Sequence, residues 1–336
     1  MMCPMPYSTL PWLREASLFA SGSRALAELL AWGVATHGWS RVWLPSYYCP
    51  DVPATVADCL HGLELRAYPD HALDVAPALG SIPARRGDVV VVANQLGIRP
   101  RPTGDLSDGV VLVEDHSHDL GSDWARGSRA DYAFASLRKT LPLPDGGAVW
   151  SPVGHPLPPE PGAGPAAVSG RLAAALARRA TSADAAIPFR ALARSAVGRA
   201  RIASTPAISP MSRALLPHMP FSGWRDARRR NFEDLARAVP LPAGVRLLVP
   251  PLGGAAFALT LVFDDPSGRD RALRMLSDRA IAPTVVWPLN PTIHPWTSAS
   301  DADLSGRILS LPCDQRFSEA NVRDLAAVMR DALRAR

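Results

Sequence analysis

Lysine is almost absent from this sequence. Of its 36 lysine and arginine residues only Lys139 is a lysine, and the other 35 are arginines. A preference for arginine accounts for the missing lysines but not for the one that is present. An arginine side chain stays protonated in proteins, whereas a lysine amine can lose its proton and attack a carbonyl carbon. Lys139 is therefore either a chance survivor on the surface or a residue whose amine is needed for chemistry.

Long hydrophobic runs and paired cysteine motifs are also missing. The candidate hydrophobic runs, residues 89–92 and 110–113, have the length of strands and fall far short of a membrane span. The N-terminus has no basic stretch followed by an apolar one, so we expect no secretory signal. The four cysteines are scattered without a CxxC motif: Cys3, Cys49, Cys59 and Cys313. This pattern predicts a cytoplasmic protein without a membrane partner and argues against a zinc site.

Positive charge exceeds negative charge by 5 and is concentrated in two stretches. The first surrounds the single acid Asp184 and contains Arg171, Arg178, Arg179, Arg190, Arg194, Arg199 and Arg201. The second contains Arg225, Arg228, Arg229 and Arg230. Such stretches suit an anionic partner, but solvated helix faces explain them equally well. Aromatic residues do not alternate with the arginines, so we do not expect nucleic-acid binding.

Helical and strand patterns alternate along the first half of the chain. Residues 23–36 and 51–59 have the pattern of helices. Short apolar segments typical of strands cover residues 41–44, 63–68, 88–93, 110–114, 132–135 and 148–150. Runs such as VVVVA and GVVLVE are apolar without alternation, as in strands buried on both faces. We therefore predict an α/β fold with a mostly parallel sheet covered by helices.

The pattern changes in the second half. Residues 151–167 are rich in proline and glycine and indicate a loop, and an Ala/Arg-rich helical region follows. Residues 225–239 indicate a longer helix. Beyond it we expect strands at 245–249, 257–263, 282–286 and 308–311, with helices at 269–279 and 318–333. We predict a large domain over residues 1–240 and a smaller C-terminal α+β domain over residues 241–336.

Two segments near the N-terminus have features of a ligand site. SGSRAL, residues 21–26, is a turn of small residues that leads into a helix, whose unpaired N–H groups and positive dipole end suit a phosphate. PSYYC, residues 45–49, follows a strand and offers Tyr47 and Tyr48 for stacking on a flat ring. A plain helix cap and core packing are the simpler explanations of the two segments.

A hydrophobic strand pattern ends in acidic residues and histidines in the segment VVLVEDHSHDLG, residues 110–121. Asp115 would lie at the C-terminal end of a buried parallel strand, where α/β sheets bind ligands. His116, His118 and Asp119 also allow a metal site, but no further ligand cluster supports one, and we predict that none is present.

The segment ASLRKTLPLPDGG, residues 135–147, contains the lone Lys139, with Ser136 before it and Gly146 and Gly147 after it. Together the four segments fit pyridoxal phosphate. This cofactor needs an amine for its aldehyde, an anion for its pyridinium nitrogen, a phosphate site and a flat surface for its ring. Lys139 and Asp115 are then the catalytic residues, and a free Lys139 amine can serve as a general base.

The same segments resemble the DegT/DnrJ/EryC1/StrS family of fold type I pyridoxal phosphate-dependent aminotransferases. SGSRAL resembles the family's SGTxAL turn, EDHSHDLG its EDxAQxxG segment, SLRKTLPLPDGG its lysine segment, and RILSLPCDQRFSEANV its C-terminal LSLP segment. The resemblance extends over about residues 20–334.

This resemblance implies a role for each matching residue. Gly22, Ser23 and Arg24 would lie near the cofactor phosphate, with Ser136 as a further phosphate ligand. Asp115 would meet the pyridinium nitrogen, Ser117 the ring face, and His118 the neighbourhood of the phenolic oxygen. Lys139 would form the Schiff base. Either Tyr47 or Tyr48 would stack on the ring.

The resemblance further implies a homodimer that transfers an amino group from an amino-acid donor to a carbonyl acceptor, such as a sugar or a secondary-metabolite intermediate. The family's GxNxR-like segment after the lysine, which reaches across the dimer interface, is not found in this sequence. Two alternatives remain open. One is a pyridoxal phosphate enzyme that catalyses elimination, decarboxylation or C–C bond formation, and the other is a cofactor-binding protein without turnover.

Overall fold

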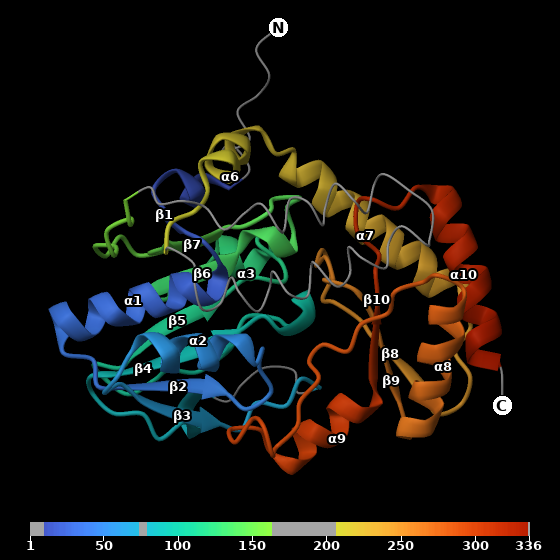
Figure 1. Cartoon of the computed structure of the whole chain (residues 1–336), viewed down its shortest axis with the longest axis horizontal. Helices are drawn as coiled ribbons and strands as arrows, with labels where there is room; N and C mark the ends of the chain where they lie inside the picture. The colour runs from blue at the N-terminus through green and yellow to red at the C-terminus, as the bar shows by residue number, and fades with distance from the viewer. Residues whose placement is uncertain (1–9, 74–78, 163–205, 335–336) are drawn as a thin grey trace, which may run out of the picture.

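Two β-sheets form the framework of the protein (Figure 1). A computed structural model describes residues 10–73, 79–162 and 206–334. The larger sheet comprises β1 (Ser17–Phe19), β2 (Arg41–Pro45), β3 (Glu64–Tyr68), β4 (Asp88–Ala93), β5 (Val111–Asp115), β6 (Tyr132–Ser136) and β7 (Gly147–Trp150). Its order is β1-β7-β6-β5-β4-β2-β3, and the five strands from β3 to β6 are parallel. β7 is antiparallel to β6, and β1 is antiparallel to β7. The predicted α/β fold with a mostly parallel sheet is confirmed.

Helices cover both faces of the larger sheet, as the apolar run of its central strand β4 requires. Val89 and Val91 of β4 pack in one cluster with α1 (Gly22–His37) and α2 (Asp51–Cys59). Val90 and Val92 face the opposite side and pack with Trp124 of α3 (Asp123–Arg126). All six residues of β4 are buried, as expected for a parallel strand between two layers of helix.

The smaller sheet is antiparallel and comes from the C-terminal part of the chain. Its strands are β8 (Val245–Leu248), β9 (Leu259–Phe263) and β10 (Ile308–Leu311), in the order β10-β9-β8. One face packs against α7 (Phe221–Ala238), α8 (Pro266–Asp278) and α10 (Glu319–Arg334), which lie together at the right of Figure 1. The remaining described helices are α6 (Pro210–Leu215) and α9 (Ala299–Arg307), with short 3-10 turns at Pro11–Arg14, Leu79–Ser81, Gln95–Gly97, Leu137–Lys139 and Leu216–His218.

The two sheets are joined through a shared hydrophobic cluster. Val262 of β9 and Ile308 of β10 pack with Tyr47, which follows β2, and with Leu96, which follows β4. The loops at the C-terminal ends of the parallel strands therefore contact the smaller sheet. This arrangement places a ligand site of the larger sheet against residues from the C-terminal half.

Several predicted elements differ from the structure. Residues 282–286 were expected to form a strand but contribute only an isolated bridge between Thr284 and Ser310. Helix α9 was not predicted from the sequence, although its Ser298–Asp301 capping box is a recognisable start signal. The Ala/Arg-rich helical region and the first arginine stretch lie largely or wholly within residues 163–205, outside the described part of the chain.

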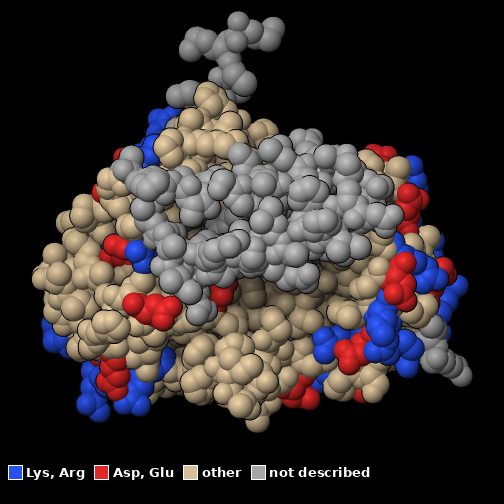
Figure 2. Space-filling view, in the orientation of Figure 1, with Lys and Arg blue, Asp and Glu red and all other residues tan. Residues whose placement is uncertain are grey.

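Charged residues are mixed rather than segregated on the surface of Figure 2, where basic and acidic side chains alternate over the region of α8 and α10. Within the described ranges, none of the helices has the length and apolarity that crossing a membrane requires.

Candidate active site

The ends of β5 and β6 and the start of α1 meet at one edge of the larger sheet. β5 ends at Asp115 and β6 at Ser136, and the two strands are parallel neighbours with Asp115 opposite Phe134. The carboxyl ends of parallel strands are where α/β proteins place their ligand sites. The predicted site segments therefore converge, although they are distant in the sequence.

The start of α1 lies directly against the end of β6. A Cβ atom added to Gly22 would come within 2.8 Å of the Ser136 Cβ, and one added to Gly147 would come within 2.1 Å of the Ser21 carbonyl oxygen. Only glycine fits at both positions. The side chain of Ser21 caps the helix by accepting from the Arg24 N–H at 3.2 Å. The N–H groups of Gly22 and Ser23 belong to the first turn and have no acceptor within the helix, as an anion site requires.

The guanidinium group of Arg24 has other partners. It contacts Glu28 on the same helix at 3.1 Å and donates to the Cys59 Sγ at 2.7 Å. Arg24 is one of the three residues predicted near the phosphate at the start of α1. Its side chain has no described contact with Ser136. Gly22 offers only its backbone, whereas Ser23 also has a hydroxyl, which lies 3.2 Å from the Ser21 hydroxyl.

Asp115 is buried and held by two hydrogen bonds. Its Oδ2 accepts from the Tyr48 hydroxyl at 2.6 Å, and its Oδ1 accepts from the Ser117 N–H at 2.8 Å. Burial raises the pKa of Tyr48 well above its ordinary value, so this phenol stays a proton donor. Each carboxylate oxygen has a second lone pair and can accept one more bond.

The neighbouring Tyr47 has different contacts. Its hydroxyl donates to the Val286 carbonyl oxygen at 2.5 Å and accepts from the Trp287 N–H at 3.0 Å. Its ring belongs to the cluster between the two sheets. Tyr48 is therefore the tyrosine at Asp115, and Tyr47 connects the C-terminal half to the larger sheet.

Ser117 links the two strands at the site. Its hydroxyl oxygen accepts from the Ser136 N–H at 2.8 Å, while its own N–H binds Asp115. The ends of β5 and β6 are thereby held together beyond the last pair of the ladder. Asp115, Ser117 and Ser136 form one connected group.

Lys139 contacts His118, and the hydrogen bonds of this histidine define its protonation. The Nδ1 of His118 accepts from the Leu96 N–H at 2.9 Å, and its Nε2 lies 3.2 Å from the Lys139 Nζ. Burial, together with the positive charges of Lys139 and Arg228, lowers the pKa of His118 well below its ordinary value. A neutral imidazole whose Nδ1 accepts must carry its proton on Nε2.

The Nε2–H of His118 can then bind Lys139 only as a donor. An ammonium group has no lone pair, whereas a neutral amine accepts such a bond. Burial also lowers the pKa of Lys139, and the nearby acidic groups of Cys49 and Asp115 only partly oppose this shift. Geometry and desolvation therefore both favour a neutral, nucleophilic Lys139.

Two aromatic residues from the C-terminal half complete the surroundings of the lysine. The His118 ring stacks between Phe257 and Trp287, with ring centroids 4.5 and 5.6 Å away. The Lys139 Nζ lies 4.6 Å from the centroid of the Trp287 ring. The sequence analysis missed both residues, since each lies more than 100 positions from Lys139 and no local motif marks it.

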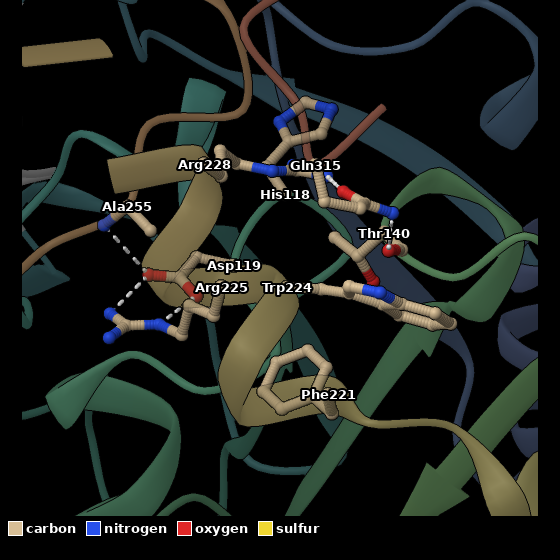
Figure 3. A pocket seen from close by; sticks show the side chains of 9 residues that line it. All are labelled: His118, Asp119, Thr140, Phe221, Trp224, Arg225, Arg228, Ala255 and Gln315. Atoms are coloured by element: carbon tan, nitrogen blue, oxygen red, sulfur yellow. Dashed lines mark hydrogen bonds and ion pairs between the residues drawn. The ribbon is translucent and has the colours of Figure 1, made fainter. Parts of the chain in front are cut away.

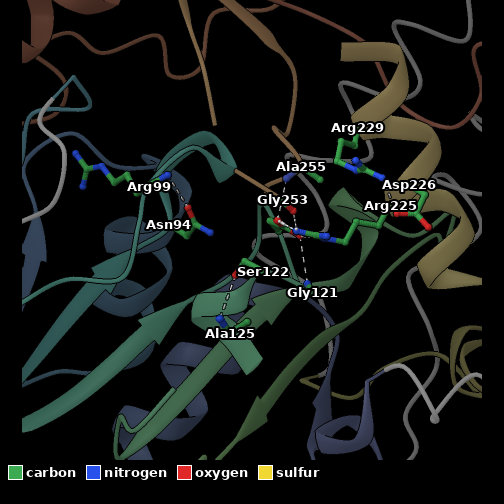
Figure 4. A network of polar contacts seen from close by, with 11 residues as sticks. Asn94, Arg99, Gly121, Ser122, Ala125, Arg225, Asp226, Arg229, Gly253 and Ala255 are labelled. Carbon is green, nitrogen blue, oxygen red and sulfur yellow. Dashed lines mark hydrogen bonds and ion pairs between the residues drawn. The ribbon is translucent and has the colours of Figure 1, made fainter. Parts of the chain in front are cut away.

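The three residues that suggested a metal site have separate partners. His116 contacts Glu114 at 2.9 Å, and His118 contacts Lys139. Asp119 is bound by Arg225 through two hydrogen bonds of 2.9 and 2.8 Å (Figure 3), and Arg225 also donates to the Gly253 carbonyl oxygen (Figure 4). Across the described ranges, no group of three His, Cys, Asp or Glu residues could hold a metal ion.

The second arginine stretch does not form a single basic surface. Arg225 binds Asp119, and Arg229 lies near Asp226 and Glu233, both at 3.7 Å. Arg228 is buried. The four arginines therefore have distinct surroundings, and a uniform solvated helix face does not describe them.

Solved structures with the same architecture are aminotransferases. The aminotransferase TlmJ from Streptoalloteichus hindustanus matches with a TM-score of 0.62 and 18% identity over 98% of this chain and 89% of its own. DesI, solved with its TDP-sugar product, matches with a TM-score of 0.63 and 19% identity over 95% and 81% of the two chains. A DegT DnrJ EryC1 StrS aminotransferase from Brucella abortus matches with a TM-score of 0.57 and 16% identity over 100% and 92%.

No family model matches the sequence, and no curated protein matches it either. The structural neighbours nonetheless cover nearly the whole chain, including both sheets. They are the group of enzymes that the sequence motifs resemble. The chain thus has the pyridoxal phosphate-dependent transferase fold of type I, in the form found in DegT/DnrJ/EryC1/StrS aminotransferases.

Proposed function

We propose that this protein is a pyridoxal phosphate-dependent aminotransferase that moves an amino group from an amino-acid donor to a carbonyl acceptor. The observation that carries the proposal is the pairing of Lys139 with a neutral His118, which favours a free amine on the only lysine of the chain. Amine nucleophiles of this kind are the groups that bind carbonyl cofactors.

The residues around Lys139 fit pyridoxal phosphate. The carboxylate of Asp115 can accept a bond from a protonated ring nitrogen while Tyr48 and Ser117 hold it in place. The N–H groups of Gly22 and Ser23 and the hydroxyl of Ser136 would bind the phosphate at the start of α1. The Nε2–H of His118 would donate to the phenolic oxygen, and Tyr48, Ser117 or Trp287 would border the ring.

When bound, the cofactor supplies an aldehyde and an electron-accepting ring. The neutral amine of Lys139 is the group that would hold this aldehyde. When free, the same amine could accept a proton from the Cα of a bound amino acid. Asp115 would favour the protonated ring nitrogen throughout by direct charge attraction.

The first test is the absorbance spectrum of the purified protein. We expect a near-violet band that Lys139→Ala abolishes, and borohydride reduction should leave a pyridoxyl group on Lys139 that peptide mass spectrometry detects. The exposed Arg138→Ala variant serves as the control and should keep the band. A wild-type protein that gains no band after incubation with pyridoxal phosphate would exclude the proposal.

The second test separates amino transfer from the other reaction types. An amino donor should shift the absorbance of the loaded protein from the near-violet to the near-ultraviolet, and a keto acid should be released in equal amount. If no donor in a panel of amino acids produces this change, elimination, decarboxylation or C–C bond formation becomes the better proposal, since all use the same two catalytic residues. Lack of turnover with every substrate would favour a cofactor-binding protein.

We propose a sugar or a related secondary-metabolite intermediate as the acceptor, because DesI was solved with a TDP-sugar product. The resemblance to this family also supports a homodimer. Light scattering would test it, and a mass equal to the 35.9 kDa chain would contradict it.

A further inference from the structure

A pocket lies on the side of His118 where α7 packs (Figure 3). His118 and Asp119, which follow β5, and Thr140, which follows β6, line it together with Arg225 and Arg228 of α7 and with Gln315. Its empty volume is about 250 Å³, including the space open to solvent. Much of that volume is open to solvent, so the pocket suits a small polar group rather than a whole sugar nucleotide.

Arg228 is a buried cation without an acidic partner among the described residues. Its exposed fraction is 5%, and its Nη1 has no hydrogen-bond partner in that part of the chain. Its Nη2 reaches the Oε1 of Gln315 at 3.5 Å, and its guanidinium carbon lies 5.8 Å from the centroid of the Phe257 ring. A buried charge is costly unless it is paired, and a guanidinium group does not lose its proton to avoid this cost.

The carboxylates nearest to Arg228 are already bound. Asp119 accepts from Arg225 and from the Ala255 N–H (Figure 3). Asp314 accepts two hydrogen bonds from the side chain of Arg316. With His118 neutral, the lining carries two arginine charges and one carboxylate. The pocket is therefore positive overall.

Thr140 provides a second buried polar atom without a partner. Its Oγ1 is buried and makes no hydrogen bond in the described structure. Thr140 follows Lys139 directly, and His118 borders both the pocket and the lysine. A planar anion in this pocket would satisfy the guanidinium group and the hydroxyl together, close to the reactive amine.

We propose that Arg228 and Thr140 bind a carboxylate group of the small-molecule substrate. If the chain is an aminotransferase, as proposed above, that group belongs to the amino-acid donor. Arg228 then selects amino donors by the distance between their carboxylate and their amino group, and the position of the pocket sets that distance. The existence of the carboxylate site does not depend on the cofactor, although the identity of its occupant does.

Calorimetric titration with acetate and succinate, neither of which can react at Lys139, tests the site directly. Arg228→Met, which keeps most of the side-chain volume, should weaken binding roughly 10- to 100-fold, as expected for the loss of a charge-assisted hydrogen bond. Arg230→Met is the matched control, because Arg230 is exposed on the same helix, and it should bind like the wild type. Equal binding by wild type and Arg228→Met would overturn the proposal, as would undetectable binding by the wild type at about 100 mM, a concentration far above the millimolar range of weak ligands.

Two further variants keep the test decisive if Arg228→Met does not fold. Gln315→Glu places a carboxylate beside the guanidinium group, so it should abolish succinate binding and raise the melting temperature. Arg228→Lys retains the charge without the planar pair of donors and should bind several-fold more weakly than wild type. Wild-type affinity in both variants would also reject the site.

Separate readouts distinguish this inference from the proposed aminotransferase. The Arg228→Met protein should keep the near-violet band of Lys139-bound cofactor and show a raised KM for the amino donor. A normal band with unchanged succinate binding and KM would refute only the carboxylate site. Succinate binding that depends on Arg228 in a wild-type protein without any band would refute only the aminotransferase.

Discussion

At the scale of single residues, the lone lysine depends on its neighbour for its chemistry. The Leu96 N–H fixes the tautomer of His118, and the Nε2–H of His118 then stabilises the neutral amine of Lys139. The histidine is itself held between two aromatic rings. Lys139 and His118 therefore act as a pair, and a change in either should alter the reactivity of the other.

The pair predicts a pH dependence. The lowered pKa of Lys139 keeps its amine neutral at pH values where an ordinary lysine is protonated. Capture of pyridoxal phosphate by the cofactor-free protein should therefore be half-maximal at a lower pH than capture by free lysine. The rate of capture should fall as the pH drops through that lowered pKa.

In His118→Phe, which keeps a stacked ring but has no Nε2–H, the neutral amine loses its donor, and the profile should move to higher pH. Stopped-flow measurement of the near-violet band as a function of pH gives both profiles. His218→Phe, outside the site, is the control. An identical profile in His118→Phe and wild type would show that the hydrogen bond does not affect the amine.

At the scale of elements, the contact between α1 and β6 defines the proposed phosphate site. Gly22→Ala would place a Cβ within 2.8 Å of the Ser136 Cβ, so the helix must move away from the strand. We expect a loss of about 1–3 kcal/mol in the free energy of unfolding, together with weaker binding of pyridoxal phosphate. Urea unfolding and titration with the cofactor measure the two effects.

Gly223→Ala provides the control for this substitution. Gly223 lies in α7, and a Cβ added to it would have no other atom within 4 Å. Alanine at this position should therefore stabilise the helix by about 0.5–1 kcal/mol. Cofactor binding should not change. If Gly22→Ala were as stable as wild type and bound the cofactor equally well, the close approach would have no role in the site.

Elements with a strong local pattern could be predicted from the sequence, and those that depend on distant partners could not. The apolar runs at 88–93 and 110–114 predicted β4 and β5 to within one residue at each end. Residues 282–286 have a similar apolar character, yet they form only one bridge, and Trp287 lies beside Lys139 instead. The bridge joins the edge strand β10, and Pro283 lacks the N–H that a longer ladder would need, so local apolarity alone does not predict a strand here.

The proposed site shows the same division. Asp115, Ser117, Ser136 and Lys139 lie in short motifs at strand ends, and the sequence alone predicted that they belong together. The contacts of Phe257, Trp287 and Arg228 arise from the packing of the C-terminal half against the larger sheet. No local signal marks such contacts, because each joins residues that are far apart in the sequence.

At the scale of the whole molecule, Tyr47 connects the two sheets. Its ring is fully buried between them, and its hydroxyl bonds both to Val286 and to Trp287. Through Trp287 this connection extends to the side chain of Lys139. We propose a domain boundary near residue 240, so that Tyr47 couples the larger domain to the smaller one.

Tyr47→Phe should lower the free energy of unfolding by about 1–3 kcal/mol, because two buried backbone groups lose their partner. The near-violet band should shift or broaden as Trp287 becomes less well positioned. Tyr132→Phe is the matched control, since Tyr132 is also buried but lies outside the contact between the two sheets. Urea unfolding followed by the band and by tryptophan fluorescence measures both effects, and loss of stability without any change in the band would limit Tyr47 to a packing role.

The lone lysine of this chain also makes it a single-site reporter. Protein grown with lysine labelled at its side-chain nitrogen would give one signal in a nitrogen-detected magnetic resonance spectrum, and that signal needs no assignment. Its position above the Trp287 ring exposes it to a ring-current field. Shifts of this single resonance would therefore report protonation of the amine, movement of the Trp287 ring and binding of a carbonyl compound.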